Sequence, residues 1–385
     1  MTFVLPKFTP PDFTLAKFAN VKNIKVEEVS KNGVAPSGFY LTSHMPTYYH
    51  NENKWMLPEH NSQNCVAVLM GDAIIIKELN DLVVGDKVVL GRDANLDNGI
   101  LVYKEGFDET VVTESGKSVE TSFTNDYEYL AQLMRHEKDN GGHIVWVLGP
   151  SVVFDYYTRI GLSELAENGY VQALLAGNAM ATHDLEAGYL DTALGQNIYT
   201  QESMPMGHYN HLDLLNEVKR TGSINEFIKE GNVEDGFIKT LDKLDIPYVL
   251  VGSIRDDGPL PEVYHDIPKG LSAMKEQTDK ATLIIGLATM LHSVSAAELA
   301  SSYRIKEDGT IVPVFMYSID ITENVVNKVV AARENIAVRG MVTNVQDFVV
   351  NIQRRLVSPE DFYKAVPSKA DAYEYMENIA KKHHQ

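Results

Sequence analysis

The segment from residue 176 to residue 186 carries the densest chemistry in this chain. It reads Ala-Gly-Asn-Ala-Met-Ala-Thr-His-Asp-Leu-Glu and follows an apolar run at 170–175 that is typical of a buried strand. Its small residues would let a turn and a helix N-terminus approach an anion or a dinucleotide closely. His183, Asp184 and Glu186 then place titratable side chains within one helical turn. The alternative is an ordinary strand-to-helix turn, since the segment does not match the G-x-G-x-x-G fingerprint.

The elements that would position these residues alternate between helical and strand-like patterns from residue 126 onward. Residues 126–138 have a helical apolar spacing. Strand-like segments follow at 143–148, 171–175, 248–251, 283–287, 314–317 and 337–341. Such alternation predicts an α/β fold, in which crossover helices join the strands of a parallel sheet.

The chain before residue 120 has a different character. Short β-branched segments at 66–70, 73–76 and 87–90 are separated by glycine turns, which indicates a small β-rich unit. We therefore expect three parts. These are a β-rich N-terminal domain at 1–122, an α/β domain at 123–357 and a C-terminal helical tail at 358–385.

Composition excludes several classes of protein. The net charge of −19, with no cluster of Lys and Arg, argues against a nucleic-acid partner. No apolar run approaches 18 residues, so no membrane span is expected, and the first residues lack the pattern of a secretory signal. Cys65 is the only cysteine, which rules out an internal disulfide and favours a reducing compartment. We expect a cytoplasmic protein with no membrane contact.

Polar turns follow the other expected strands as well, and in a parallel sheet these turns meet at one edge, where ligands bind. They lie at 149–151, 252–261, 288–293, 318–320 and 342–344. Asp320 closes a strand, where a carboxylate can accept hydrogen bonds from ribose hydroxyls and would repel a 2′-phosphate, favouring NAD over NADP. The alternative for Asp320 is a cap of the helix that follows.

Four segments, in this order along the chain, make it similar to a known family. They lie at 176–186, 207–212, 252–261 and 288–293, and the stretch at 32–40 adds to them. The chain resembles the archaeal-type ornithine cyclodeaminases, also described as the LOR/SDH conserved domain, which form the C-terminal part of bifunctional arginine dihydrolase/ornithine cyclodeaminases. The resemblance implies a Rossmann-like sheet with helices on both faces. It also implies an NAD cofactor and conversion of ornithine to proline and ammonia, with NAD recycled.

The resemblance also assigns roles to residues. The implied NAD contacts fall on Gly177, Asn178, Ala179, Asp256, Thr289, Met290, Leu291, His292, Asp320, Val342 and Thr343. A base is needed for the substrate's ammonium groups, and His183, Asp184 and Asp257 are the candidates. Arg255 is the expected partner of the substrate carboxylate, because its fork matches two oxygens, although it could instead pair with a neighbouring aspartate.

Two departures from the family pattern keep the substrate open. Residues 154–159 read Phe-Asp-Tyr-Tyr-Thr-Arg where we expect a His-Thr-Gly-Gly-like run, and His50 stands near an expected basic residue. Alternatives are therefore another NAD-dependent amino-acid or opine oxidoreductase on the same scaffold, or a non-catalytic NAD-binding protein. His208 and His211 have a spacing that a metal can use, but the resemblance implies no metal. We expect a homo-oligomer, either a dimer or a tetramer.

Overall fold

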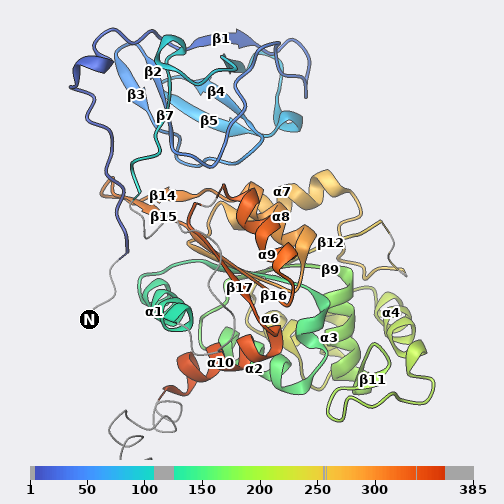
Figure 1. The fold of residues 1–385 in the computed structure, drawn as a ribbon. Coiled ribbons are helices and arrows are strands. Elements are labelled where there is room, and N and C mark those ends of the chain that lie inside the picture. Colours follow the sequence, from blue (N-terminus) through green and yellow to red (C-terminus); the bar gives the residue numbers. More distant parts are fainter. Residues whose placement is uncertain (1–4, 108–124, 255, 257, 335, 360–385) are drawn as a thin grey trace, which may run out of the picture.

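The computed structural model describes residues 5–107, 125–254, 256, 258–334 and 336–359. A β-rich N-terminal part lies against a larger α/β part (Figure 1). In the N-terminal part, two antiparallel sheets have the orders β1-β6-β4-β5 and β3-β2-β7. Their strands are β1 Lys25–Glu28, β2 Thr47–Asn51, β3 Lys54–Met56, β4 Val66–Met70, β5 Ala73–Lys77, β6 Lys87–Leu90 and β7 Ile100–Val102. The strands predicted at 66–70 and 87–90 are confirmed to the residue.

The α/β part is built on a six-stranded parallel sheet. Its strands are β8 Ile144–Leu148, β9 Ala173–Gly177, β12 Tyr248–Val251, β13 Leu283–Leu287, β16 Phe315–Asp320 and β17 Val338–Val342. They are arranged in the order β12-β9-β8-β13-β16-β17. Counted along the chain this is the order 3-2-1-4-5-6 of the doubly wound dinucleotide-binding fold. The predicted Rossmann-like α/β class is confirmed.

Each strand of this sheet is apolar on both sides because helices cover both faces. In β8, Ile144, Trp146 and Leu148 belong to one buried cluster, and Val145 and Val147 belong to the other. Helices α1 Asn125–Asp139, α2 Tyr156–Glu167, α3 Asn178–Leu190, α6 Phe237–Lys243 and α10 Val345–Val357 pack into the first cluster. Helices α7 Ile267–Thr278, α8 Met290–Leu299 and α9 Glu323–Ala332 cover the opposite face (Figure 1).

Smaller elements were not predicted. The hairpin β10 Thr192–Ala193 with β11 Gln196–Asn197 follows α3, and η5 Gly207–Tyr209 leads into α4 Asn210–Thr221 and α5 Ile224–Lys229. A second hairpin pairs β14 Tyr303–Ile305 with β15 Ile311–Pro313. These strands are too short to produce a readable alternation of apolar residues. Most of the predicted C-terminal helical tail lies outside the described residues. Within the described part of the chain, no helix is long and apolar enough to span a membrane.

Buried hydrogen bonds join the N-terminal part to the α/β part beside the second hairpin. Asn61 accepts a hydrogen bond from the hydroxyl of Ser301 at 2.9 Å, and the Tyr303 hydroxyl donates to the Pro58 carbonyl at 2.7 Å. His44 is buried there, and its backbone N–H donates to the Glu334 carboxylate at 2.7 Å. Because these groups are removed from water, losing one partner would leave a costly unpaired polar atom.

This interface should weaken in acid. Burial, followed by the nearby charge of Arg333, holds the pKa of His44 well below its usual value. The unfolded chain therefore binds a proton on this ring near pH 6.5, while the folded chain does not. The free energy of unfolding should fall as the pH is lowered through 6.5, by up to about 1.4 kcal/mol per pH unit from this ring.

Urea unfolding between pH 7.5 and pH 5 would measure this loss. His44→Gln should flatten the slope, and His265→Gln, at an exposed position, should leave it at the wild-type value. Identical slopes in His44→Gln and the wild type would show that His44 does not contribute to acid sensitivity.

Candidate functional site

The site lies at the carboxyl edge of the parallel sheet, around the switch point between β8 and β13. Gly149 follows β8, and its N–H donates to the Leu287 carbonyl at 2.8 Å. A Cβ at this position would lie 1.8 Å from the carbonyl oxygen of Ala288, so only glycine fits. The chain then enters η4 Pro150–Val153 directly, without the glycine-rich loop that binds pyrophosphate in many Rossmann folds.

The N-terminus of α3 supplies the first set of predicted cofactor residues. Gly177 is the N-cap residue, no side chain caps the helix, and Asn178 and Ala179 form its first turn. The Asn178 side-chain oxygen accepts from the Leu260 N–H at 3.0 Å, which ties this turn to the loop that follows β12. A helix of 13 residues with no acidic side chain in its first turn presents its N–H groups to an anion.

The N-terminus of α8 supplies the second set. Thr289 is its N-cap residue, without a side-chain cap bond, and Met290, Leu291 and His292 form the first turn. A Cβ on Gly177 would lie 3.1 Å from Cε1 of His292, so the glycine allows the two helix ends to approach each other. Burial lowers the pKa of His292, against the opposing effects of the Val251 carbonyl and the Asp256 carboxylate. The ring is therefore neutral near pH 7.

The third set lies on the two neighbouring strands β16 and β17. Asp320 pairs in register with Val342, and its carbonyl accepts from the Thr343 N–H at 3.0 Å. Its carboxylate oxygen Oδ1 accepts from the N–H and the hydroxyl of Thr322, at 2.9 and 2.8 Å. Thr322, not Asp320, is the N-cap of α9. Both hydrogen bonds use Oδ1, so among the residues that the structure describes none bonds to Oδ2, which could accept from the hydroxyls of a ligand.

The predicted cofactor role of Asp320 has a direct test. Asp320→Ala should raise the dissociation constant for NAD about 10- to 100-fold, since a charge-assisted hydrogen-bond pair is worth on the order of 1.5–3 kcal/mol. Asp347→Ala, at an exposed position in the first turn of α10, is the matched control. Calorimetry that gives both variants the same affinity would remove Asp320 from the site.

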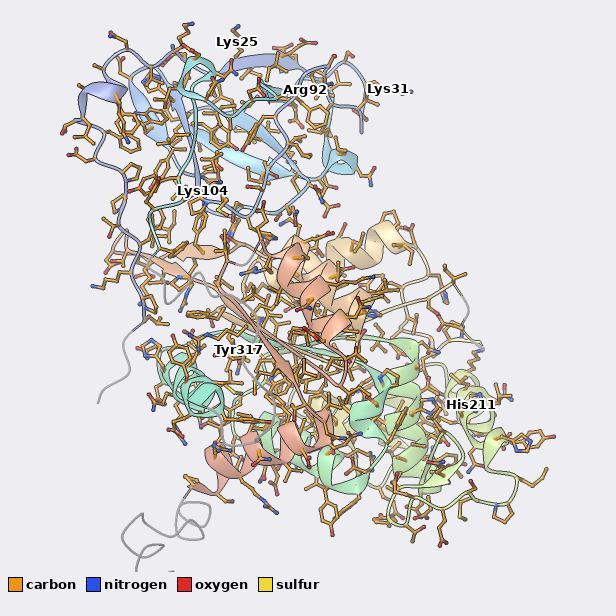
Figure 2. The ribbon with its side chains drawn as sticks, viewed as in Figure 1. Lys25, Lys31, Arg92, Lys104, His211 and Tyr317 are labelled. Carbon is orange, nitrogen blue, oxygen red and sulfur yellow. The ribbon has the colours of Figure 1, made fainter. Side chains whose placement is uncertain are left out.

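A pocket of about 310 Å³ lies against the start of α3. It is lined by Asn178, Ala179, Thr182, His183, Leu194, His208, His211, Leu215 and Asp256. The rings of His183 and His211 have centroids 6.1 Å apart, and His211 projects from α4 on the side of the molecule away from the N-terminal part (Figure 2). The pocket is therefore lined by three of the predicted cofactor residues, Asn178, Ala179 and Asp256, together with imidazole rings.

The neighbouring residues His183 and Asp184 point to different surroundings. His183 lines the pocket, and its Nδ1 lies 2.7 Å from Oε2 of buried Glu186. Asp184 is buried away from the pocket, where its Oδ1 accepts from Nε of Arg159 at 2.8 Å and its Oδ2 from the Ile238 N–H at 2.7 Å. The structure thus separates two of the candidate bases, because successive residues of a helix are about 100° apart.

The remaining candidates fall in the loop after β12. Arg255 and Asp257 lie outside the described residues. Asp256 accepts from the N–H and the hydroxyl of Ser253, at 2.9 and 3.1 Å, and its side chain lines the pocket. Among the residues that the structure describes, no group of three or more His, Cys, Asp or Glu side chains could hold a metal ion.

The two departures from the family pattern have different positions. The Phe154 ring lies edge-on against His183, with centroids 5.6 Å apart, while the Asp155 carboxylate caps α2 and is not presented to the pocket. His50 lies in β2, where its Nδ1 contacts the Lys22 carbonyl at 3.0 Å and its ring packs near Trp55. His50 is not among the residues that line the pocket, and β2 belongs to the N-terminal sheets (Figure 1).

The fold and the site define a Rossmann-type α/β protein, and comparison with known proteins identifies its family. A family model described as arginine dihydrolase ArgZ-like, C-terminal, Rossmann fold, matches residues 128–352. The chain is 33% identical over 302 residues to the ornithine cyclodeaminase of Methanocaldococcus jannaschii, covering 75% of this chain and 70% of that protein. The chain therefore belongs to the ornithine cyclodeaminase family that shares the ArgZ-like Rossmann domain, as the sequence predicted.

Solved structures and a further relative support the same family assignment. A LOR/SDH protein from Methanococcus maripaludis superimposes with a TM-score of 0.78 at 29% identity, covering 88% of this chain and 100% of that one. A ternary complex of AgrE with ornithine and NAD⁺ superimposes with a TM-score of 0.56 at 30% identity, covering 89% of this chain and 48% of AgrE. A bifunctional arginine dihydrolase/ornithine cyclodeaminase AgrE from Nostoc is 31% identical over 351 residues, covering 87% of this chain and 47% of that protein.

Proposed function

We propose that this protein is an NAD-dependent ornithine cyclodeaminase, which converts L-ornithine to L-proline and ammonia with internal recycling of NAD. The observation that carries the proposal is the shared wall of the pocket. Asn178 and Ala179 belong both to an uncapped helix N-terminus at the sheet edge and to a pocket with imidazole and carboxylate side chains. A cofactor and a small amino acid could therefore meet there. A relative, AgrE, has been solved with both ornithine and NAD⁺.

The residues present fit NAD. The N–H groups at the starts of α3 and α8 suit its phosphates, and the free Oδ2 of Asp320 suits a ribose hydroxyl and disfavours the 2′-phosphate of NADP. Val342 and Thr343 lie beside Asp320 at the same edge of the sheet. When bound, NAD supplies a reversible hydride acceptor.

The chain's own residues would handle the substrate's charges. His183 would accept a proton on its Nε2 from a substrate ammonium, which leaves the substrate nitrogen with a lone pair, and Asp256 would attract the cation. Arg255 remains our proposed partner of the substrate carboxylate, and Asp257 a second candidate base. Asp184, already paired with Arg159, is better placed to support the fold than to exchange protons.

The test is turnover of ornithine with catalytic amounts of NAD⁺. Proline and ammonia should form in equal amounts, without lasting accumulation of NADH, because the cofactor is recycled. Steady accumulation of NADH would identify an ordinary amino-acid dehydrogenase. NAD binding without turnover of ornithine would favour an enzyme for a different amine or a non-catalytic NAD-binding protein.

Two further expectations accompany this function. We propose a homo-oligomeric enzyme, a dimer or a tetramer, since closed assemblies are common for metabolic enzymes of this size. We also propose a cytoplasmic location, because the single cysteine suits a reducing compartment.

A further inference from the structure

We propose that Glu186 is a positioning residue that holds the His183 ring with its proton on Nδ1 and its acceptor nitrogen, Nε2, toward the pocket. This inference rests on the proposed function, because it takes His183 as the base of that reaction. The contact that carries it is the 2.7 Å approach between His183 Nδ1 and Glu186 Oε2. Glu186 lies three residues after His183 on the same face of α3, and its side chain is 0% exposed.

The second oxygen of Glu186 is held in the same way. The Thr192 hydroxyl donates to Glu186 Oε1 at 2.7 Å, and the Asn210 side-chain N–H donates to the Thr192 oxygen at 2.8 Å. Donation therefore runs from Asn210 through Thr192 to Glu186. Since an ionised carboxylate only accepts hydrogen bonds, the nitrogen of His183 that faces it must be the donor.

This arrangement determines which nitrogen can react. With Nδ1–H directed at Glu186, the neutral ring carries its lone pair on Nε2, on the opposite side of the imidazole. His183 lines the pocket although its side chain is only 10% exposed, so the outward part of the ring faces that space. The packing of the Phe154 ring edge against His183 restricts rotation of the imidazole.

The network also connects the base to the pocket wall. Thr192 begins the hairpin β10–β11, and Asn210 begins α4, which carries His211. A change at Glu186 should therefore disturb the orientation of the base more than the packing of the core. A buried carboxylate that orients a catalytic imidazole and stabilises its protonated form has this role in the Ser-His-Asp proteases.

Other titratable groups around His183 bear on the pH dependence. They are Glu186 on its own helix, His211 on α4, His208 on η5 and Asp256 in the loop after β12. Of these, Glu186 is the carboxylate within hydrogen-bond distance of the ring. Removing its charge should move the acid limb of the kcat profile to lower pH, because the protonated imidazole loses its counter-charge.

The experiment compares the wild type with Glu186→Gln, which keeps the side-chain shape, and Glu217→Gln, on the exposed face of α4. With ornithine and saturating NAD⁺, Glu186→Gln should lose at least about tenfold in kcat, with a smaller change in KM and an acid limb at lower pH. Thr192→Val should lower kcat and shift the acid limb in the same directions as Glu186→Gln, but by smaller amounts. Glu217→Gln should match the wild type.

A second measurement is independent of turnover. Histidine ¹⁵N NMR of the selectively labelled protein should show the neutral His183 ring with its proton on Nδ1, and Glu186→Gln should populate the Nε2–H form. An unchanged tautomer together with an unchanged acid limb would overturn the inference. A lower kcat that is accompanied by a lower melting temperature, with no shift of the acid limb, would also overturn the inference, because it would show a structural role for Glu186. If the wild type does not turn over ornithine, the proposed function fails, and the NMR comparison still decides whether Glu186 orients His183.

Discussion

Replacing Arg159 by methionine is expected to lower the free energy of unfolding by about 3–5 kcal/mol. Arg159 is 0% exposed, and its guanidinium pairs with Asp184 at 2.8 Å and with Asp235 at 2.7 Å. It also donates to the backbone carbonyls of both aspartates. Burial alone would lower the pKa of Arg159, but the two carboxylates outweigh it and raise the pKa. The methionine variant would leave the Asp184 carboxylate buried without its counter-charge.

Urea unfolding of Arg159→Met and of a control variant measures the effect. In the control, Arg220→Met, the lost partner is Glu217 on the surface of α4, with side chains 65% and 37% exposed. Such a solvent-exposed pair contributes little to stability, so Arg220→Met should unfold at nearly the wild-type urea concentration. The double variant Arg159→Met/Asp184→Leu should recover part of the loss, because it removes the stranded charge. Similar losses in Arg159→Met and Arg220→Met would contradict a structural role for the buried pair.

The sheet could be predicted from the sequence because most residues of its strands are buried and apolar. The apolar runs at 248–251 and 283–287 coincide with β12 and β13 to the residue. The run predicted at 314–317 overlaps the first half of β16, which begins at Phe315 and extends to Asp320. The end of that strand, Ser318 to Asp320, is buried as well, but its polar residues Ser318 and Asp320 give no apolar pattern that would mark the extension.

Within the site, the sequence placed the polar turns at one edge but could not assign their side chains. His183 and Asp184 are adjacent and both titratable, and they have different partners because α2 and α6 pack on one side of α3 and α4 packs on the other. Arg159 lies within a departure from the family pattern, but its partner is Asp184, 25 residues away in the sequence, which the local pattern does not indicate. Tertiary packing, and not local spacing, decides these cases.

The hydrogen-bond network of His183 shows which of its contacts could be recognised from spacing in the sequence. His183 and Glu186 are three residues apart, a spacing that places both on one face of a helix and could have identified the pair. Thr192 and Asn210 had no such signal, since they join the network through a short hairpin and a helix start. A pair within one helix is readable from sequence, whereas a network that spans loops is not.

The second large effect is expected at the base. His183→Asn should lower kcat for ornithine about 10²- to 10⁴-fold, the usual contribution of a positioned general base, and leave the affinity for NAD nearly unchanged. The imidazole lines the pocket and is not itself among the predicted cofactor residues, of which only Asn178, Ala179 and Asp256 line the pocket with it. Single-turnover kinetics and calorimetry with NAD⁺ measure the two quantities separately.

The neighbouring position provides the comparison that identifies the base. Asp184→Asn should reduce stability but keep kcat per folded molecule within about tenfold of the wild type, because its carboxylate is engaged by Arg159 and the Ile238 N–H. If Asp184→Asn loses turnover while His183→Asn keeps it, the assignment of the two residues must be reversed. If both keep it, the base lies elsewhere, and Asp257→Asn is the next variant to measure. A large loss in His183→Asn alone requires that the proton leave the substrate toward α3, on the pocket side of the helix.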